Sequence, residues 1–305
     1  MMEKPNILIG VGSPSDFKKY FKDVTLDDRA NYFLSVASTH RVPELVERHT
    51  ASQHWDGIVA CAGLTNGRLG QQLSLANEGE IIVGVPLGEY DIKGLASFLS
   101  STEFPQGYPA AATKLNDIGS ALRHIVTLTT TQFDHVVLMH NSKSDNKRVA
   151  ATKSSLGAVG IPCAVIYVYS EDTLAALTRS SKKYQDENGL FIAVLDDELP
   201  YKFNPPLSHL KNIDPLIIIS YDPKADPSKY FDVVKGASDN ILFLGTDQGE
   251  NLVLYTASVL AVRNTRLKEK IREKRLDGRK KYDDYPNVLP LPTTQSLKDI
   301  ITNAV

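Results

Sequence analysis

The stretch Ser38-Thr39-His40-Arg41-Val42-Pro43-Glu44 decides how we read the rest of this chain. It follows the apolar run 32–37 and precedes a helix that we expect to begin at Pro43. A strand that ends in Ser-x-His-Arg places its polar groups at one edge of a sheet, where ligands bind in open α/β folds. Imidazole is the side chain that titrates near neutral pH, and the fork of N–H groups on Arg41 suits phosphate. The alternative interpretation is a surface loop with an uninvolved His40.

The composition is that of a globular protein with one large domain or two ordinary ones. The 305 residues are 42% hydrophobic and 23% charged, and a formal net charge of -2 gives no reason to expect nucleic acid or an anionic membrane as a partner. No run approaches the roughly 20 apolar residues that span a bilayer, and the N-terminus has no signal-peptide pattern. Cys61 and Cys163 stand alone in apolar runs, which predicts buried thiols rather than a disulfide or a metal site. We therefore expect a cytoplasmic protein.

Short apolar strands alternate with helices through the first 130 residues, which is typical of a parallel sheet covered on both faces. We therefore predict an α/β fold with three layers, α/β/α, and a flavodoxin-like parallel sheet. The expected strands are 6–11, 32–37, 57–62, 80–86 and 108–112, and the expected helices begin at 17 and span 43–53, 94–101 and 117–129.

The same pattern then begins again. Runs like the earlier strands occur at 165–170 and 189–194, each 132 residues after its counterpart (170 minus 38, 189 minus 57), and the turn at 141–145 repeats 12–16 at an offset of 129. We predict two tandem copies of one domain, followed by a long C-terminal helix. The predicted domains are 1–131, 132–249 and 250–305, with further strands in the second copy at 135–140, 215–220 and 240–244.

The second copy keeps the strand pattern of the first copy but lacks its candidate catalytic and binding residues. At the offset of 132, His40 corresponds to Asp172 and Arg41 to Thr173. The copy that carries the polar loop is therefore predicted to be the catalytic one, and the other to be degenerate.

We expect one long helix from Glu250 past Lys274, with an apolar first part, 252–262, that should be buried. Its second part, 263–281, is rich in Lys and Arg, with Glu and Asp residues placed between them. That mixture is typical of a solvated or subunit-bridging helix rather than a nucleic-acid site.

The motifs of the first half resemble the PurE family of aminoimidazole ribonucleotide carboxylases. That family reads G-S-x-S-D where this chain has 12–16, and S-A-H-R-T-P where it has 38–43. The resemblance continues through 62–67, 83–86, 94–100 and 104–109, and so covers the first half nearly end to end. Six motifs in the right order are a specific signal, although each one alone is modest.

This resemblance implies an enzyme of purine synthesis that forms 4-carboxy-5-aminoimidazole ribonucleotide from a ribonucleotide substrate and CO2, without metal or cofactor. The family assembles eight single-domain chains, so four duplicated chains should form a homotetramer that mimics the octamer. The resemblance makes His40 the catalytic acid–base. It assigns substrate binding to Gly12, Ser13, Ser15, Asp16, Ser38, Arg41, Gly63, Thr65 and Asn66.

The carboxyl donor stays open because the motifs point both ways. The segment 62–67 resembles the class that uses CO2 directly, whereas Arg41 and 84–86 resemble the class that rearranges the N5-carboxy isomer. Two other functions also stay open, a PurE-like carboxylase of another ring and a non-catalytic nucleotide-binding scaffold.

Local alternatives exist for the loop residues. Ser15 and Asp16 are good helix caps for a helix starting at Phe17. A Ser38–His40–Asp16 triad lacks a nucleophile elbow, and Gly10-Val11-Gly12 lacks the rest of a dinucleotide-binding motif.

Overall fold

The computed structural model describes residues 3–63, 66–75, 80–102, 109–140, 147–168, 188–195, 213–220, 234–246, 249–262 and 264–280. The chain divides into a compact unit of residues 1–272 and a second unit of residues 273–305. None of the helices in these described ranges is long and apolar enough to cross a membrane.

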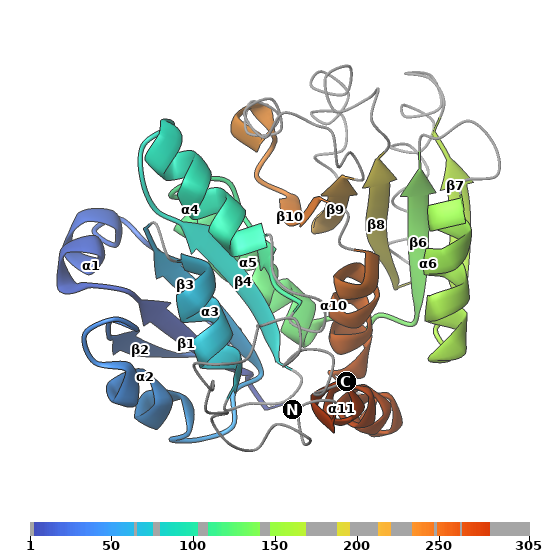
Figure 1. The fold of residues 1–305 in the computed structure, drawn as a ribbon, viewed down its shortest axis with the longest axis horizontal. Helices are drawn as coiled ribbons and strands as arrows, with labels where there is room; N and C mark the ends of the chain where they lie inside the picture. The colour runs from blue at the N-terminus through green and yellow to red at the C-terminus, as the bar shows by residue number, and fades with distance from the viewer. Residues whose placement is uncertain are drawn as a thin grey trace, which may run out of the picture. The chain divides into compact units, whose positions relative to one another are not determined.

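The first half contains five parallel strands in the order β2-β1-β3-β4-β5. Figure 1 labels β1 to β4 of this set. Having β1 between β2 and β3 is the flavodoxin-like order, and it confirms the predicted fold class. The predicted strand at 108–112 is observed only as two residues. The bounds are β1 Asn6–Val11, β2 Asn31–Val36, β3 Gly57–Ala62, β4 Ile81–Pro86 and β5 Ala111–Ala112.

Five helices follow these strands, and two differ from the expectation. The first begins at Pro14 rather than Phe17, since Ser13 caps it and proline is favoured in the first helical turn. A helix at 66–75 was not predicted, because Gly67 and Gly70 weaken its helical pattern. The bounds are α1 Pro14–Tyr20, α2 Pro43–Thr50, α3 Asn66–Leu75, α4 Ile92–Thr102 and α5 Ile118–Thr130.

Alternate residues of β3 face two different helical layers, as the period of a strand requires. Ile58 packs in a cluster with Leu69 and Leu73 of α3. Its neighbour Val59 packs in another cluster with Ile125 of α5. Both faces of the sheet are therefore buried at β3, which is why this strand reads as a continuous apolar run.

The second half repeats this strand order. Read from its outer edge the order is β7-β6-β8-β9-β10, which is the first-half order with five added to each number. The strand order is thus repeated, and the tandem duplication itself stays a prediction. The bounds are β6 His135–His140, α6 Lys147–Ala158, β7 Cys163–Tyr167, β8 Gly189–Leu195, β9 Leu216–Ser220 and β10 Ile241–Thr246.

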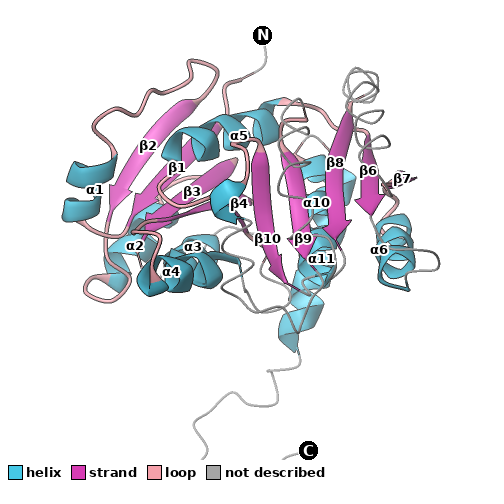
Figure 2. Ribbon diagram, turned by 90° about the horizontal axis from the view of Figure 1, so that it is seen from above, coloured by secondary structure: helices cyan, strands magenta, loops and turns pink. Residues whose placement is uncertain are grey.

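One ten-stranded sheet joins the two halves. Strands β5 and β10 pair antiparallel, with Ala112 opposite Phe243. Figure 2 shows β10, β9 and β8 continuing across the sheet from β4. Every other pairing in the sheet's described residues is parallel.

The single long C-terminal helix was a wrong prediction. Two helices are present, α10 Gly249–Ala261 and α11 Thr265–Lys280. The Asn264 side chain accepts a hydrogen bond from the Leu267 N–H (3.0 Å), so it caps a new helix instead of continuing the old one. The predicted burial of the apolar part is confirmed, because residues 251–261 of α10 are all buried.

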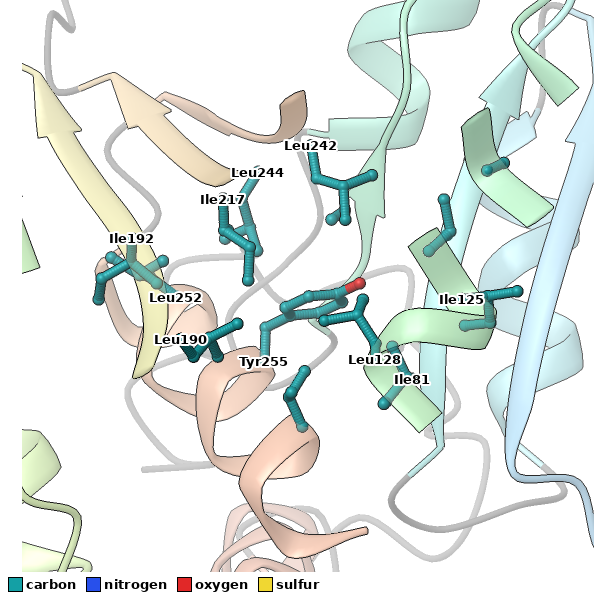
Figure 3. Close-up of a cluster of buried hydrophobic side chains, with 14 of the residues drawn as sticks. Ile81, Ile125, Leu128, Leu190, Ile192, Ile217, Leu242, Leu244, Leu252 and Tyr255 are labelled. Carbon is teal, nitrogen blue, oxygen red and sulfur yellow. The ribbon is translucent and has the colours of Figure 1, made fainter. Parts of the chain in front are cut away.

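Helix α10 fills a core shared by both halves. Tyr255, which is 1% exposed, points among Leu190, Leu242 and Leu244 of the second half and Ile81 and Leu128 of the first (Figure 3). The two halves thus bury apolar surface against a single helix, which favours their folding as one unit.

Candidate functional site

Three loops begin side by side at the carboxyl edge of the first-half strands. Val11, the last residue of β1, lies opposite Val36 of β2 and Cys61 of β3. The backbone continues this pairing into the loops, since Gly12 N–H donates to Cys61 O (2.9 Å) and Ala37 N–H donates to Val11 O (3.0 Å). Each predicted site residue in the described ranges lies within five residues of the end of one of these strands.

The first loop is held by its two serines. Ser13 Oγ accepts a hydrogen bond from Asp16 N–H (3.1 Å) and lies 2.8 Å from Ser15 Oγ. Ser13 is therefore the N-cap of α1, and the alternative that Ser15 and Asp16 cap this helix is wrong. Asp16 occupies the first turn and is half-buried, which leaves its carboxylate near the loop surface.

Gly12 is needed for close contact between strands. A Cβ at Gly12 would lie 2.9 Å from the Ala62 Cβ, closer than real side chains approach. This glycine therefore has a packing role in addition to its predicted place in the site.

The second loop is a tight turn around Ser38. Val42 N–H donates to Ser38 O (2.9 Å), and His40 N–H donates to Ser38 Oγ (3.3 Å). Thr39 is buried, whereas His40 and Arg41 are exposed. The turn therefore presents the imidazole and the guanidinium on the surface at the sheet edge.

The third loop begins at Gly63, where side-chain and backbone groups from two other segments meet. Ser97 Oγ of α4 donates to Gly63 O (2.9 Å), and Leu87 N–H donates to Ala62 O (2.9 Å). Of the remaining predicted residues, Thr65 lies outside the described residues, and Asn66 is the first residue of α3.

Sequence reasoning did not single out Ser97. Ser97 belongs to the segment 94–100, which carries part of the family resemblance, and its place in that segment was the available signal. Only the fold shows that its hydroxyl reaches the turn after β3.

Cys61 is also close to this edge but is a poor nucleophile. Burial, with a smaller effect from the Asp16 charge, raises the pKa of the Cys61 thiol far above its ordinary value. A thiol that stays protonated cannot attack as thiolate. The chemistry of this edge therefore falls to the exposed polar side chains.

Two cavities lie elsewhere, and neither was predicted. One is lined by His54, Asp56, Glu80 and Lys268, and the other by Phe133, Asn188, Asp214 and their neighbours. Asp56 and Glu80 precede β3 and β4, and Asn188 precedes β8, so both cavities lie at the amino ends of the strands. Within the described ranges no group of three or more His, Cys, Asp or Glu residues is placed to hold a metal ion.

Residues 6–131 match the model of a protein family described as AIR carboxylase. Residues 6–131 belong to the AIR carboxylase family. A curated relative of this AIR carboxylase region is the N5-carboxyaminoimidazole ribonucleotide mutase of Methanocaldococcus jannaschii, 36% identical over 107 residues that cover 34% of this chain and 66% of the relative. The enzyme of the same name from Bacillus subtilis is 28% identical over 120 residues, or 38% of this chain and 74% of the relative.

The solved structure described next carries no argument for this assignment. An open substrate-binding protein from Clostridium difficile covers 76% of this chain and 82% of its own, but its TM-score is 0.24 and its identity 12%. The AIR carboxylase assignment rests on residues 6–131 alone.

Proposed function

We propose that this chain forms 4-carboxy-5-aminoimidazole ribonucleotide in purine synthesis. The observation that carries the proposal is the convergence of the Gly12, Ser38 and Gly63 loops at one sheet edge, within a region that belongs to the AIR carboxylase family. Ligands bind at this edge in open α/β sheets.

Each of the three loops binds a different part of the substrate. Ser13, Ser38 and Arg41 hold the ribose phosphate, since hydroxyl and guanidinium groups are its usual partners. Asp16 accepts hydrogen bonds from the ribose hydroxyls. Gly63, Thr65 and Asn66 line the pocket for the ring and CO2, while Gly12 and Ser15 shape the first loop.

His40 carries the proton in this mechanism. The electron-rich ring carbon attacks the carbon of CO2, and the new C–C bond forms as one C=O π pair moves to oxygen and gives the carboxylate. The same ring carbon then gives up its hydrogen as a proton to His40, and the C–H electron pair restores the aromatic ring. A group that moves such a proton contributes about 10²–10⁴-fold to the rate, and confinement of CO2 beside the ring supplies much of the remainder.

The decisive experiment supplies the full-length chain with each substrate in turn. Aminoimidazole ribonucleotide plus bicarbonate tests direct carboxylation, and the N5-carboxy isomer without bicarbonate tests rearrangement. The curated relatives above are named as mutases, which favours the second substrate. Product from neither substrate would overturn the proposal and would favour a carboxylase of another ring or a silent scaffold.

We also propose a cytoplasmic homotetramer in which the second half replaces alternate subunits of an octamer. The repeated strand order supports this arrangement. So do apolar side chains on the two edge strands, where Phe33 and Leu34 of β2 are 39% and 49% exposed and Val165 and Tyr167 of β7 are 37% and 36% exposed.

A further inference from the structure

The side chain of Ser97 reaches from α4 to the turn that follows β3. Ser97 is fully buried, and its hydroxyl lies 2.9 Å from Gly63 O and 3.3 Å from Ala62 O. A hydroxyl has one hydrogen to donate, and the shorter distance assigns it to Gly63. A buried hydroxyl without an acceptor lowers the stability of the fold. This hydrogen bond therefore holds both the Ser97 hydroxyl and the Gly63 carbonyl in place.

Three successive carbonyls, two at the end of β3 and one at the start of the turn, are held in different ways. Gly12 N–H donates to Cys61 O and Leu87 N–H donates to Ala62 O, both at 2.9 Å. Both of these donors are backbone groups, whereas the donor to Gly63 O is the Ser97 side chain. A substitution at Ser97 therefore releases the carbonyl nearest the proposed pocket and leaves the other two in place.

Side-chain packing does little to fix Gly63 itself. The nearest atom to a Cβ built on Gly63 is Leu87 O at 3.7 Å, an ordinary contact distance. The hydrogen bond from Ser97 therefore contributes more than side-chain packing does to the position of Gly63.

Helix α4 is in turn anchored to the second half of the chain. Phe98, next to Ser97, packs edge-on against Phe243 of β10 with ring centroids 5.7 Å apart. Both rings are buried, at 0% and 1% exposed. The second half thereby supports the helix that holds the turn.

We propose that Ser97 is a positioning residue for the reaction, which holds the Gly63 carbonyl so that the turn keeps its place beside the ring and CO2. This inference rests on the proposed function. A displacement of about 1 Å at a reacting site costs on the order of 10²-fold in rate, so losing this one hydrogen bond affects turnover more than it affects substrate affinity.

Ser101 offers a matched control. It lies one turn further along α4, is 1% exposed, and its Oγ donates to Ser97 O (2.8 Å) within the helix rather than to the turn. Ser97→Ala and Ser101→Ala remove the same atom at the same burial from the same helix.

The experiment measures kcat, KM and thermal unfolding of both full-length variants with the substrate on which the wild type is active. We expect Ser97→Ala to lower kcat about 10- to 100-fold with KM within about twofold, and Ser101→Ala to keep the wild-type kcat. Equal kcat values for the two variants would overturn the inference while leaving the proposed function intact. A wild type that makes no product would instead refute the proposed function, and the inference with it.

A second pair covers the case in which Ser97→Ala does not fold. Ser97→Thr and Ser97→Val have the same shape and differ in the hydroxyl, so any packing cost is common to both. We expect the threonine variant to exceed the valine variant in kcat by about tenfold or more. Equal turnover would again contradict the positioning role.

Discussion

His124 and Asp214 join the two halves of the chain at a buried ring. His124, on α5, is 0% exposed, and its Nδ1 lies 2.9 Å from Asp214 Oδ1, just before β9. Its Nε2 lies 2.8 Å from the carbonyl of Asp239, just before β10. Both partners present acceptor oxygens to the two nitrogens of the ring. Arg123 adds a donor to the same carboxylate at 3.0 Å.

The first prediction concerns this contact. Asp214→Asn should lower the free energy of unfolding by about 1–3 kcal/mol at pH 6, because hydrogen bonds to a charged group are lost around a buried ring. Asp239→Asn is the control, since that carboxylate is 62% exposed and pairs with Lys114 at the surface, where ion pairs contribute about 0–1 kcal/mol. Denaturant unfolding measures both, and an equal loss would contradict the special role of Asp214.

The same contact predicts a dependence on pH. Burial by itself raises the pKa of Asp214, but the hydrogen bond and charge of His124, and then those of Arg123, outweigh it and lower the pKa. A lowered pKa stabilises the fold above the unfolded-state value of about 3.9 and loses that effect as pH falls further. The stability advantage of the wild type over Asp214→Asn should therefore be complete near pH 6 and shrink below about pH 4. A stability difference between the wild type and Asp214→Asn that increased as the pH fell would contradict this prediction.

The third prediction tests the proposed base. His40→Asn should fold and bind the nucleotide but lose about 10²–10⁴-fold in kcat. His49→Asn is the matched control, because His49 lies on α2 with its Nδ1 2.8 Å from Ser35 Oγ and has a structural partner. Wild-type turnover in the His40 variant would exclude the proposed mechanism.

Gly63 and Gly12 should respond differently to alanine. Gly63→Ala adds a methyl group that meets nothing closer than 3.7 Å, so thermal stability should stay near that of the wild type while activity falls because the methyl enters the proposed pocket. Gly12→Ala forces a contact of 2.9 Å and should cost about 1–3 kcal/mol of unfolding free energy. Full activity in Gly63→Ala would remove this residue from the pocket.

The fifth prediction uses the phenol of Tyr255. Its hydroxyl is buried with no hydrogen-bond partner among the described residues, and burial raises its pKa. Tyr255→Phe removes an unsatisfied group and keeps the ring, so unfolding free energy should rise by about 1 kcal/mol. Chemical denaturation with an unchanged m-value is the measurement. A clear loss of stability would mean that the hydroxyl has a partner.

Local sequence patterns were enough to predict the strands and the loops of the first half. The strands 6–11 and 57–62 were predicted with the observed bounds, because a run of apolar residues between turn signals is a local property of the chain. The loops with Ser13, Ser38 and Gly63 reached one edge because parallel strands end on the same side. That edge was therefore predictable from the sequence alone.

The contacts between distant segments could not be predicted in this way. The antiparallel pairing of Ala112 with Phe243, the shared core around Tyr255 and the hydrogen bond from Ser97 to Gly63 bring together residues more than 30 positions apart in sequence. Local patterns carry no information about which segments will meet. The helix α3 was missed because Gly67 and Gly70 weaken its helical pattern, and the break before α11 was missed because the Asn264 cap overrides a continuous helical pattern. The free energy of such contacts depends on the whole fold, so only the folded chain reveals them.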